Sequence, residues 1–394
     1  MKKRWRILII LYIVRVAMGI QYQSIASVSH ILIGDLGINY TQLGTLIGLY
    51  QLPGVILAFP GGLLARRFED KRLAVMALAL MTLGGSLIGV SGAYNLAVLG
   101  RLLSGFGYIL LNTTLTKMVY DWFAGYEIIL AMAIFVSSWP LGISIALVTL
   151  IRIALATSWQ LVMHLTSAIS FISLVIITAL YHEPKYTDRK EKSKPAQLRV
   201  SRSEALLVSL AGLIWSLFNV GFIILPSFAP EFLISKGYSA TLASSLVSTV
   251  TWIVIPSVIV GGYIAERIGQ PNIIMIACFS SIGTALILLT QYQNPLPLFI
   301  ALGVLFGPPA GVIMALPNEV LRAENRGPGM GIFYTVYYAG MATLPALAGF
   351  IQDTTENHSL PFLFGGSLFF LMIIILSLFR YSQRVLDSPR SNQS

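Results

Sequence analysis

The sequence predicts an all-α membrane protein in which twelve transmembrane helices form two six-helix, pseudo-symmetric halves. Three observations lead to this prediction. The 394 residues are 56% hydrophobic and only 11% charged, with a mean hydropathy of +0.79, whereas a soluble domain carries about twice that charged fraction. The apolar residues fall into runs long enough to cross a bilayer. One glycine-containing motif also occurs twice, half a chain apart.

The helices follow from the lengths of the apolar runs. A bilayer core of about 30 Å needs roughly 20 mostly apolar residues per helix. Twelve such runs fit, at residues 6–30, 42–65, 72–92, 96–119, 128–150, 160–181, 205–229, 240–264, 271–291, 297–318, 329–351 and 360–381. The first run imitates a signal peptide, but it continues past a typical h-region and no small-residue cleavage site follows. We therefore expect it to be the first span.

The longest polar stretch, HEPKYTDRKEKSKPAQLRVSR, separates the sixth run from the seventh. Such a charged segment is typical of a solvated linker. The expected organisation is an N-terminal six-helix bundle over 1–182, a linker over 183–203, a second bundle over 204–382 and a tail over 383–394.

The basic residues predict the orientation of the helices. All but four of the 26 lie at the N-terminus, in the linker, or at other positions on the same side of the membrane. Arg152 and Lys236 lie on the opposite side, and Arg15 and Arg101 lie within helices. We expect the protein in the inner or plasma membrane of the cell. Because Lys and Arg accumulate in cytoplasmic loops, both termini and the linker should lie in the cytoplasm. The asymmetry also explains the net charge of +10 without a nucleic-acid partner.

The motifs of common enzymes and metalloproteins are absent from the sequence. The single cysteine, Cys278, and four scattered histidines provide neither a disulfide framework nor the spacing of metal ligands. No Walker loop, nucleophile elbow or zinc motif occurs. We therefore expect no catalytic residue, no metal and no cofactor.

The repeated motif joins the second and third helices of each half. FPGGLLARRFEDKR contains Gly62, and IVGGYIAERIGQ contains Gly262 at the equivalent place. The glycines allow a sharp turn and close packing, and the basic residues hold the turn on the cytoplasmic side. Two parallel halves with a substrate at their interface are an established plan for a transporter.

These motifs, taken in order, resemble those of the major facilitator superfamily. The family's loop Gly-x-Leu-Ala-Asp-Arg-x-Gly-Arg-Lys is similar to residues 62–71 and more closely similar to 262–269. RLLSGFG, which begins at Arg101, resembles the family's Arg-x-x-x-Gly-x-Gly, and DWFAGYE resembles its Trp-Phe signature after the fourth helix. GIFYTVYYAGMATLPALAGFIQD has the glycine and proline pattern of its eleventh helix. The resemblance covers essentially the whole chain and implies a monomeric transporter whose halves rock.

The first loop departs from the family pattern. Arg66 stands where the family has an aspartate that is thought to cap the eleventh helix and lock the inner gate. An arginine is unfavourable at a helix N-terminus, which is partly positive. Either Glu69 or Asp70 substitutes for the aspartate, or the lock in this half is weak. The gate and loop residues singled out are Gly62, Arg66, Arg67, Asp70, Gly262, Glu266 and Arg267.

Arg15 is the sharpest candidate for binding a substrate. It lies near the middle of the first helix, where a charge costs at least about 2.5–3.5 kcal/mol and usually faces a water-filled cavity. All 16 carboxylates map to helix ends, loops or tails, so a bound anion is an obvious partner. The alternative is an arginine satisfied by carbonyls and hydroxyls, or one that snorkels. Tyr22 lies on the same helical face.

Other helices carry weaker candidates. The fourth helix has a polar stripe that includes Arg101, which either contacts substrate or joins helices 1 and 4. The second helix offers Tyr50 and Gln51, and the aromatic residues of helices 7 and 11 either clasp a substrate or only pack. By resemblance to the family, helices 1, 4, 7 and 10 line the cavity. The complete candidate set is Arg15, Tyr22, Arg101, Tyr108, Asn112, Trp215, Asn219, Tyr334 and Tyr338.

The sequence therefore predicts a secondary active or facilitative transporter of a small solute, an organic or inorganic anion, working by alternating access. The resemblance is closest to the anion, cyanate and nitrate branches of the family. Because no acid lies mid-membrane, uniport, exchange or coupling through the substrate's own proton stay open. Two alternatives also stay open: an exporter of amphiphilic drugs or lipids, and a non-transporting receptor on the same fold.

Overall fold

A computed structural model of the protein describes residues 3–58, 69–123, 127–183, 200–322 and 325–387, nearly all of them helical. Within these ranges no strand occurs, and ten helical segments are long and apolar enough to cross a membrane. The prediction of an all-α, multi-pass membrane protein is confirmed.

The first half contains α1 (Lys3–Ser27), α2 (Ser29–Leu36), α3 (Tyr40–Leu49), α4 (Leu52–Leu57), α6 (Asp70–Gly89), α7 (Tyr94–Phe123), α8 (Ile128–Ala156) and α9 (Trp159–Leu180). The second half contains α10 (Arg202–Ser235), α11 (Ala240–Ile268), α12 (Pro271–Leu289), α13 (Leu296–Leu305), α14 (Gly307–Val320), α15 (Arg326–Thr355) and α16 (Leu360–Asp387).

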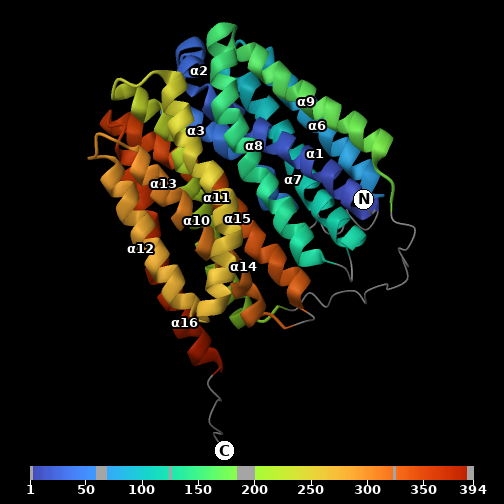
Figure 1. The fold of residues 1–394 in the computed structure, drawn as a ribbon, viewed down its shortest axis with the longest axis vertical. Coiled ribbons are helices and arrows are strands. Elements are labelled where there is room, and N and C mark those ends of the chain that lie inside the picture. The colour runs from blue at the N-terminus through green and yellow to red at the C-terminus, as the bar shows by residue number, and fades with distance from the viewer. Residues whose placement is uncertain (1–2, 59–68, 124–126, 184–199, 323–324, 388–394) are drawn as a thin grey trace, which may run out of the picture.

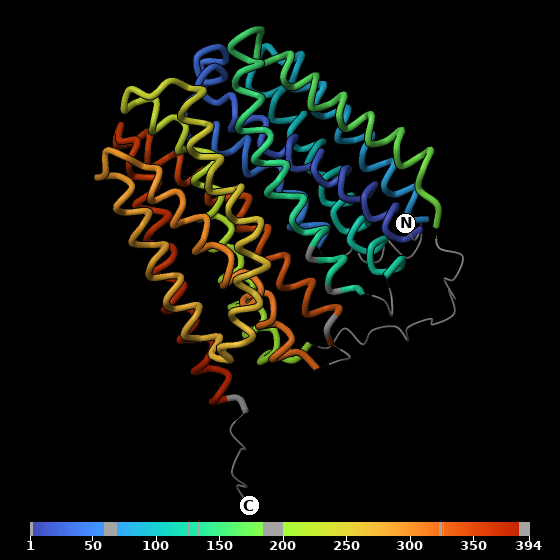
Figure 2. The backbone as a smooth tube through the Cα atoms, in the orientation of Figure 1, coloured from blue at the N-terminus to red at the C-terminus, as the bar shows by residue number. Residues whose placement is uncertain are grey.

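The two halves form two bundles, coloured blue to green and yellow to red in Figures 1 and 2. Helices α3 and α4 pack against α15, and α8 packs against α11, so these three contacts join the bundles. We call the end where α1 begins and α16 ends the termini side. The opposite end, which carries α2 and the start of α3, is called the far side.

The second predicted helix is not one continuous helix. The structure divides it into α3 and α4, with a break at Tyr50 and Gln51, and the predicted residues from 59 onward lie outside the described ranges. Pro53 is the physical reason, because it has no N–H to donate to the carbonyl of Leu49. The N–H of Gln51 instead bonds the carbonyl of Gly48 at 2.9 Å. The predicted span 297–318 is likewise divided into α13 and α14, just before Pro308 and Pro309.

Two glycines of α3 allow its backbone to touch α15. A Cβ at Gly44 would lie 2.2 Å from the carbonyl oxygen of Pro345, and one at Gly48 would lie 2.1 Å from that of Ala342. No larger residue fits at such distances without moving a helix. Small residues therefore set the crossing that joins the two halves.

The distribution of side chains fits a bilayer as solvent. Large apolar residues point outward, and Ile374 is 66% exposed, whereas Arg101 is 0% exposed. Polar residues such as Ser104, Ser144 and Ser216 are buried between helices. This inside-out pattern is expected where lipid surrounds the protein, because polar groups then find partners only inside it.

Candidate substrate-binding site and gate

Arg15 lies half-buried near the middle of α1. Its Nη1 donates to the carbonyl of Phe135 at 3.2 Å, and its guanidinium carbon lies 4.4 Å from the centre of the Phe135 ring. Its buried Nε has no partner. Within the described part of the chain, no ion pair joins Arg15 to a carboxylate. The positive charge of Arg15 is thus contacted by one carbonyl and one ring, both of Phe135.

Phenol groups from both halves surround this charge. The guanidinium interacts electrostatically with Tyr108 of α7 and with Tyr334, Tyr337 and Tyr338 of α15. Tyr334 and Tyr338 stack with centroids 6.2 Å apart, and Tyr337 lies 4.8 Å from Tyr338. Arg15 is therefore where the first half faces helix α15 of the second.

An aromatic cluster of the first half lies beside this point. Tyr50 and Tyr108 have centroids 4.8 Å apart, and Tyr22 and Trp139 have centroids 5.2 Å apart. Tyr22 also lies 5.5 Å from Tyr50, and Tyr108 lies 5.3 Å from Trp139. Gln51 lies beside the hydroxyls of Tyr22 and Tyr108. Four helical regions of the first half thus present rings and hydroxyls together.

Asn112 extends the site across the interface. It lies on α7, one turn beyond Tyr108, and beside the hydroxyl of Tyr338. Its Oδ1 is buried without a hydrogen-bond partner. The ring of Tyr338 is accommodated because position 54 is glycine, where a Cβ would lie 2.4 Å from that ring. Asn112 and Tyr338 therefore bring α7 and α15 together.

Trp215 and Asn219 lie on α10 at the margin of this group. Trp215 stacks on Phe218 at 5.7 Å and lies 6.3 Å from Tyr337. The Nδ2 of Asn219 donates to the carbonyl of Trp215 at 2.8 Å. The structure therefore links Trp215 to the tyrosines of α15, while the amide donor of Asn219 is used within its own helix.

Arg101 has a different environment from Arg15. Its Nε donates to the carbonyl of Leu46 at 2.8 Å, and its two terminal nitrogens donate to the carbonyls of Gln21 at 3.2 Å and Tyr22 at 2.7 Å. The ring of Tyr50 covers the guanidinium at 4.3 Å. Every nitrogen therefore has a protein partner, and α7 is joined to α1 and α3.

Trp139 was not among the residues singled out from the sequence. It precedes Pro140 in an apolar run, and nothing in that pattern distinguishes it from a packing residue. Its role in the aromatic cluster arises because Gly19 and Gly142 let α1 and α8 approach closely. A Cβ at Gly19 would lie 2.8 Å from the Trp139 carbonyl oxygen.

The loop motif is only partly described. Gly62, Arg66 and Arg67 lie outside the described residues. Asp70 is buried and pairs with Lys117 of α7, so its carboxylate is engaged inside the first half.

The second copy of the motif ends α11. Gly262 has open space where a Cβ would lie, whereas a Cβ at Gly261 would lie 2.6 Å from the nitrogen of Pro308. Glu266 and Arg267 are exposed, and Arg267 lies 5.1 Å from the ring of Tyr263. The close approach is therefore made by the neighbouring glycine.

The far side is closed by contacts between the halves. Asp353, near the end of α15, accepts hydrogen bonds from the backbone N–H of Tyr40 at 2.9 Å and of Thr41 at 2.7 Å. A carboxylate at the start of α3 also complements the helix dipole. His30 lies 3.1 Å from Glu231, which accepts a bond from the Tyr40 hydroxyl at 3.4 Å.

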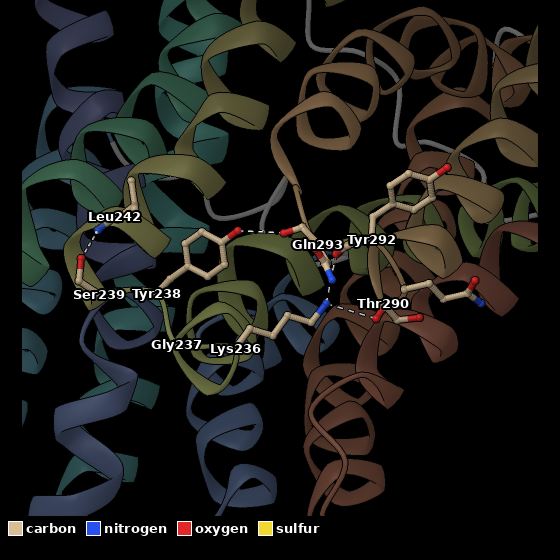
Figure 3. A pocket seen from close by; sticks show the side chains of 9 residues that line it. Lys236, Gly237, Tyr238, Ser239, Leu242, Thr290, Tyr292 and Gln293 are labelled. Atoms are coloured by element: carbon tan, nitrogen blue, oxygen red, sulfur yellow. Dashed lines mark hydrogen bonds between the residues drawn. The ribbon is translucent and has the colours of Figure 1, made fainter.

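A separate pocket of about 760 Å³ lies at the far side of the second half (Figure 3). Lys236 donates to the carbonyls of Thr290 at 3.2 Å and Tyr292 at 3.4 Å, and Tyr238 donates to that of Gln293 at 2.9 Å. These bonds tie the end of α10 to the segment after α12. None of the candidate binding residues lines this pocket.

Two bundles of membrane helices, a charge at their interface and a closed far side together define a membrane transporter. The chain belongs to the Major Facilitator Superfamily, because the model of that family matches residues 11–310. The resemblance seen in the sequence is confirmed, and the protein is a transporter and not an enzyme.

Relatives of known function are distant but cover most of the chain. The hexuronate transporter of Bacillus subtilis (strain 168) is 22% identical over 91% of this chain and 90% of its own length. The lysosomal dipeptide transporter MFSD1 of Bos taurus is 24% identical over 89% and 80%. The crystal structure of the nucleoside transporter NupG has a TM-score of 0.74 at 13% identity, covering 95% of this chain and 99% of that one. The latter likeness supports the fold alone.

Arg101→Lys is expected to lower the thermal unfolding temperature in detergent by about 5 °C or more. An ammonium cannot reproduce the forked set of bonds, and each buried carbonyl left unpaired costs about 1–3 kcal/mol. The exposed Arg152→Lys is the matched control and should unfold as the wild type does. Unchanged stability together with lost transport would instead place Arg101 in contact with substrate.

Asp353→Asn is expected to open the far side more often. The substitution removes the charge at the start of α3, and bonds to a charged acceptor contribute about 1.5–3 kcal/mol, so the open population should rise about tenfold. Spin labels at Thr157 and Gln291, in a Cys278→Ser background, would report the separation of the halves. Glu356→Gln, at the same helix end, serves as the control. An unchanged distance distribution in Asp353→Asn would show that this contact does not hold the gate.

Proposed function

We propose that this protein moves a small monoanionic carboxylate across the membrane by alternating access, with Arg15 as the anchor for the carboxylate. The observation that carries the proposal is the environment of Arg15. Its charge lies at the interface of the halves, its Nε has no partner, and the surrounding groups are neutral phenols and a carbonyl. A carboxylate would supply the missing charge and accept short, charge-assisted bonds.

The names of two relatives are consistent with such a substrate. The hexuronate transporter is named for acids of this kind. The protein named "Putative niacin/nicotinamide transporter NiaP" of Bacillus subtilis (strain 168) is 22% identical over 81% of this chain. A substrate held by Arg15 would lie between α1, α7 and α15. Tyr108, Asn112 and Tyr338 would contact it from both halves, and Tyr22, Trp215, Asn219 and Tyr334 would form the surroundings.

The proposed transport cycle uses twelve helices, with 1–182 and 204–382 as the two rocking bodies. Residues 183–203 would link them, with 383–394 as a tail. The protein would be a monomer in the inner or plasma membrane. Both of its termini would lie in the cytoplasm. In that orientation the far side is the external side, and the contacts of Asp353 and Glu231 close the external gate. The inner gate would involve the loop residues that include Arg66 and Arg267.

One observation favours the alternative of an amphiphile exporter. An apolar groove of about 540 Å³ lies between α1 and α8, lined by Trp5, Leu8, Ile9, Tyr12 and Ile134. A groove of this kind could admit an acyl chain from the membrane. Against the exporter, the charge of Arg15 favours an anionic substrate. The second alternative, a receptor on this fold, would bind its ligand without moving it.

Arg15→Ala is expected to reduce initial uptake of labelled carboxylates into proteoliposomes by about 100-fold at low substrate concentration. Loss of one partner of a buried charge pair costs about 2–5 kcal/mol. Arg15→Lys should retain part of the activity, because it keeps the charge but not the fork. Arg152→Ala is the control for loss of an exposed arginine.

Anion uptake by Arg15→Ala at the wild-type rate would contradict the proposal. Uptake of neutral or cationic amphiphiles by the wild type, with no carboxylate moved, would support the exporter instead. Binding of a carboxylate without any uptake would support the receptor.

A further inference from the structure

The break between α3 and α4 places a buried amide beside the aromatic cluster of the first half. Gln51 lies between the last residue of α3 and the first of α4, and it is 1% exposed. Because Pro53 interrupts the helix, the side chain of Gln51 turns toward the first half, beside the hydroxyls of Tyr22 and Tyr108. Discontinuous membrane helices commonly form binding sites in transporters.

The oxygen of this amide is not satisfied. The Oε1 of Gln51 is buried without a hydrogen-bond partner. Gln21 provides a comparison within the same bundle, since its Nε2 donates to the carbonyl of Met81 at 2.9 Å and its Oε1 accepts from Tyr50 at 3.3 Å. Gln21 therefore uses both ends of its amide to join helices, whereas Gln23 donates from Nε2 to the carbonyl of Pro226 at 2.8 Å and leaves its own Oε1 without a partner. Leaving a buried acceptor unpaired costs about 1–3 kcal/mol. What distinguishes Gln51 from Gln23 is its place beside Tyr22 and Tyr108, close to Arg15, where a donor on a ligand would pair with its oxygen.

Four buried polar atoms around the site have no partner: the Arg15 Nε, the Tyr22 hydroxyl, the Gln51 Oε1 and the Asn112 Oδ1. Arg15 supplies a donor for an anion. Gln51 and Asn112 supply acceptors, which require hydroxyl or N–H donors on the same ligand. An inorganic anion or a plain aliphatic acid satisfies Arg15 and leaves both amide oxygens unpaired.

We infer that Gln51 is a specificity-determining residue and that the substrate is a hydroxylated monocarboxylate, such as a sugar acid. This inference rests on the proposed function, since Arg15 must first hold the carboxylate. A hydroxyl of the substrate donates to the Gln51 oxygen, and a second donates to Asn112. The hydroxyls are favoured over a charged amino group because the partners around Arg15 are phenols and amides, with no carboxylate paired to it in the described part of the chain.

Two matched acids test the inference on the purified protein. D-Glucuronate and tetrahydropyran-2-carboxylate share a ring and a carboxylate, but only the first carries hydroxyls. Their Kd values would be measured by calorimetry for the wild type, Gln51→Met and Gln21→Met. We expect the wild type to bind glucuronate at least tenfold more tightly. Gln51→Met should weaken the binding of glucuronate about tenfold and leave the Kd of tetrahydropyran-2-carboxylate unchanged.

The unchanged Kd also shows that Gln51→Met is folded. Gln21→Met should preserve the ratio of the two Kd values, because both ends of Gln21 serve other helices. If Gln51→Met does not fold, the ratio of the two Kd values for the wild type decides whether the site prefers a hydroxylated acid. Equal affinities of the wild type for both acids, or equal weakening of both by Gln51→Met, would overturn the inference while leaving a carboxylate transporter. Failure of both acids and of every other carboxylate to bind would overturn the proposed function instead.

Discussion

The charge of Arg15 in the middle of the membrane is the constraint on which the rest of the site depends. A guanidinium there costs several kcal/mol unless groups of the protein or a ligand compensate it. Arg101 meets the same constraint with three carbonyls and the ring of Tyr50. Arg15 has one carbonyl and one ring. The contrast between the two arginines separates a residue that joins helices from the one that we propose to hold the carboxylate of a substrate.

The packing of the two halves determines which groups of the second half lie near Arg15. Small residues bring α3 against α15, and Tyr338 of α15 then lies within electrostatic reach of Arg15. The same two helices meet again at the far side, where Asp353 caps the start of α3. One pair of helices therefore connects the contacts at the far side to the proposed site.

The sequence contained enough information for the helices and the family. The predicted spans 160–181 and 271–291 agree closely with Trp159–Leu180 and Pro271–Leu289, because apolar length alone decides them. The break at Gln51 was not predicted, since the apolar run continues through Pro53. The gate at Asp353 joins residues more than 300 positions apart, a distance at which local patterns carry no information.

The two arginines show the same limit within the site. Both are single charges within apolar segments. From the sequence they could be compared only by their position along the helix and by the polar residues on the same helical face. Which of them is enclosed by carbonyls depends on the crossing of α1, α3 and α7. The orphan oxygen of Gln51 likewise depends on where Tyr22 and Tyr108 place their hydroxyls.

We propose that the site is built for a negative charge held by Arg15. The most direct test compares the binding of an acid with that of its uncharged primary amide, D-glucuronate against D-glucuronamide, to the wild-type protein by calorimetry. The two ligands differ only at the group that Arg15 would hold. If Arg15 holds the carboxylate, the acid should bind at least tenfold more tightly, since a charge-assisted bond is about twice as strong as a neutral one. Equal affinities, or tighter binding of the amide, would contradict it.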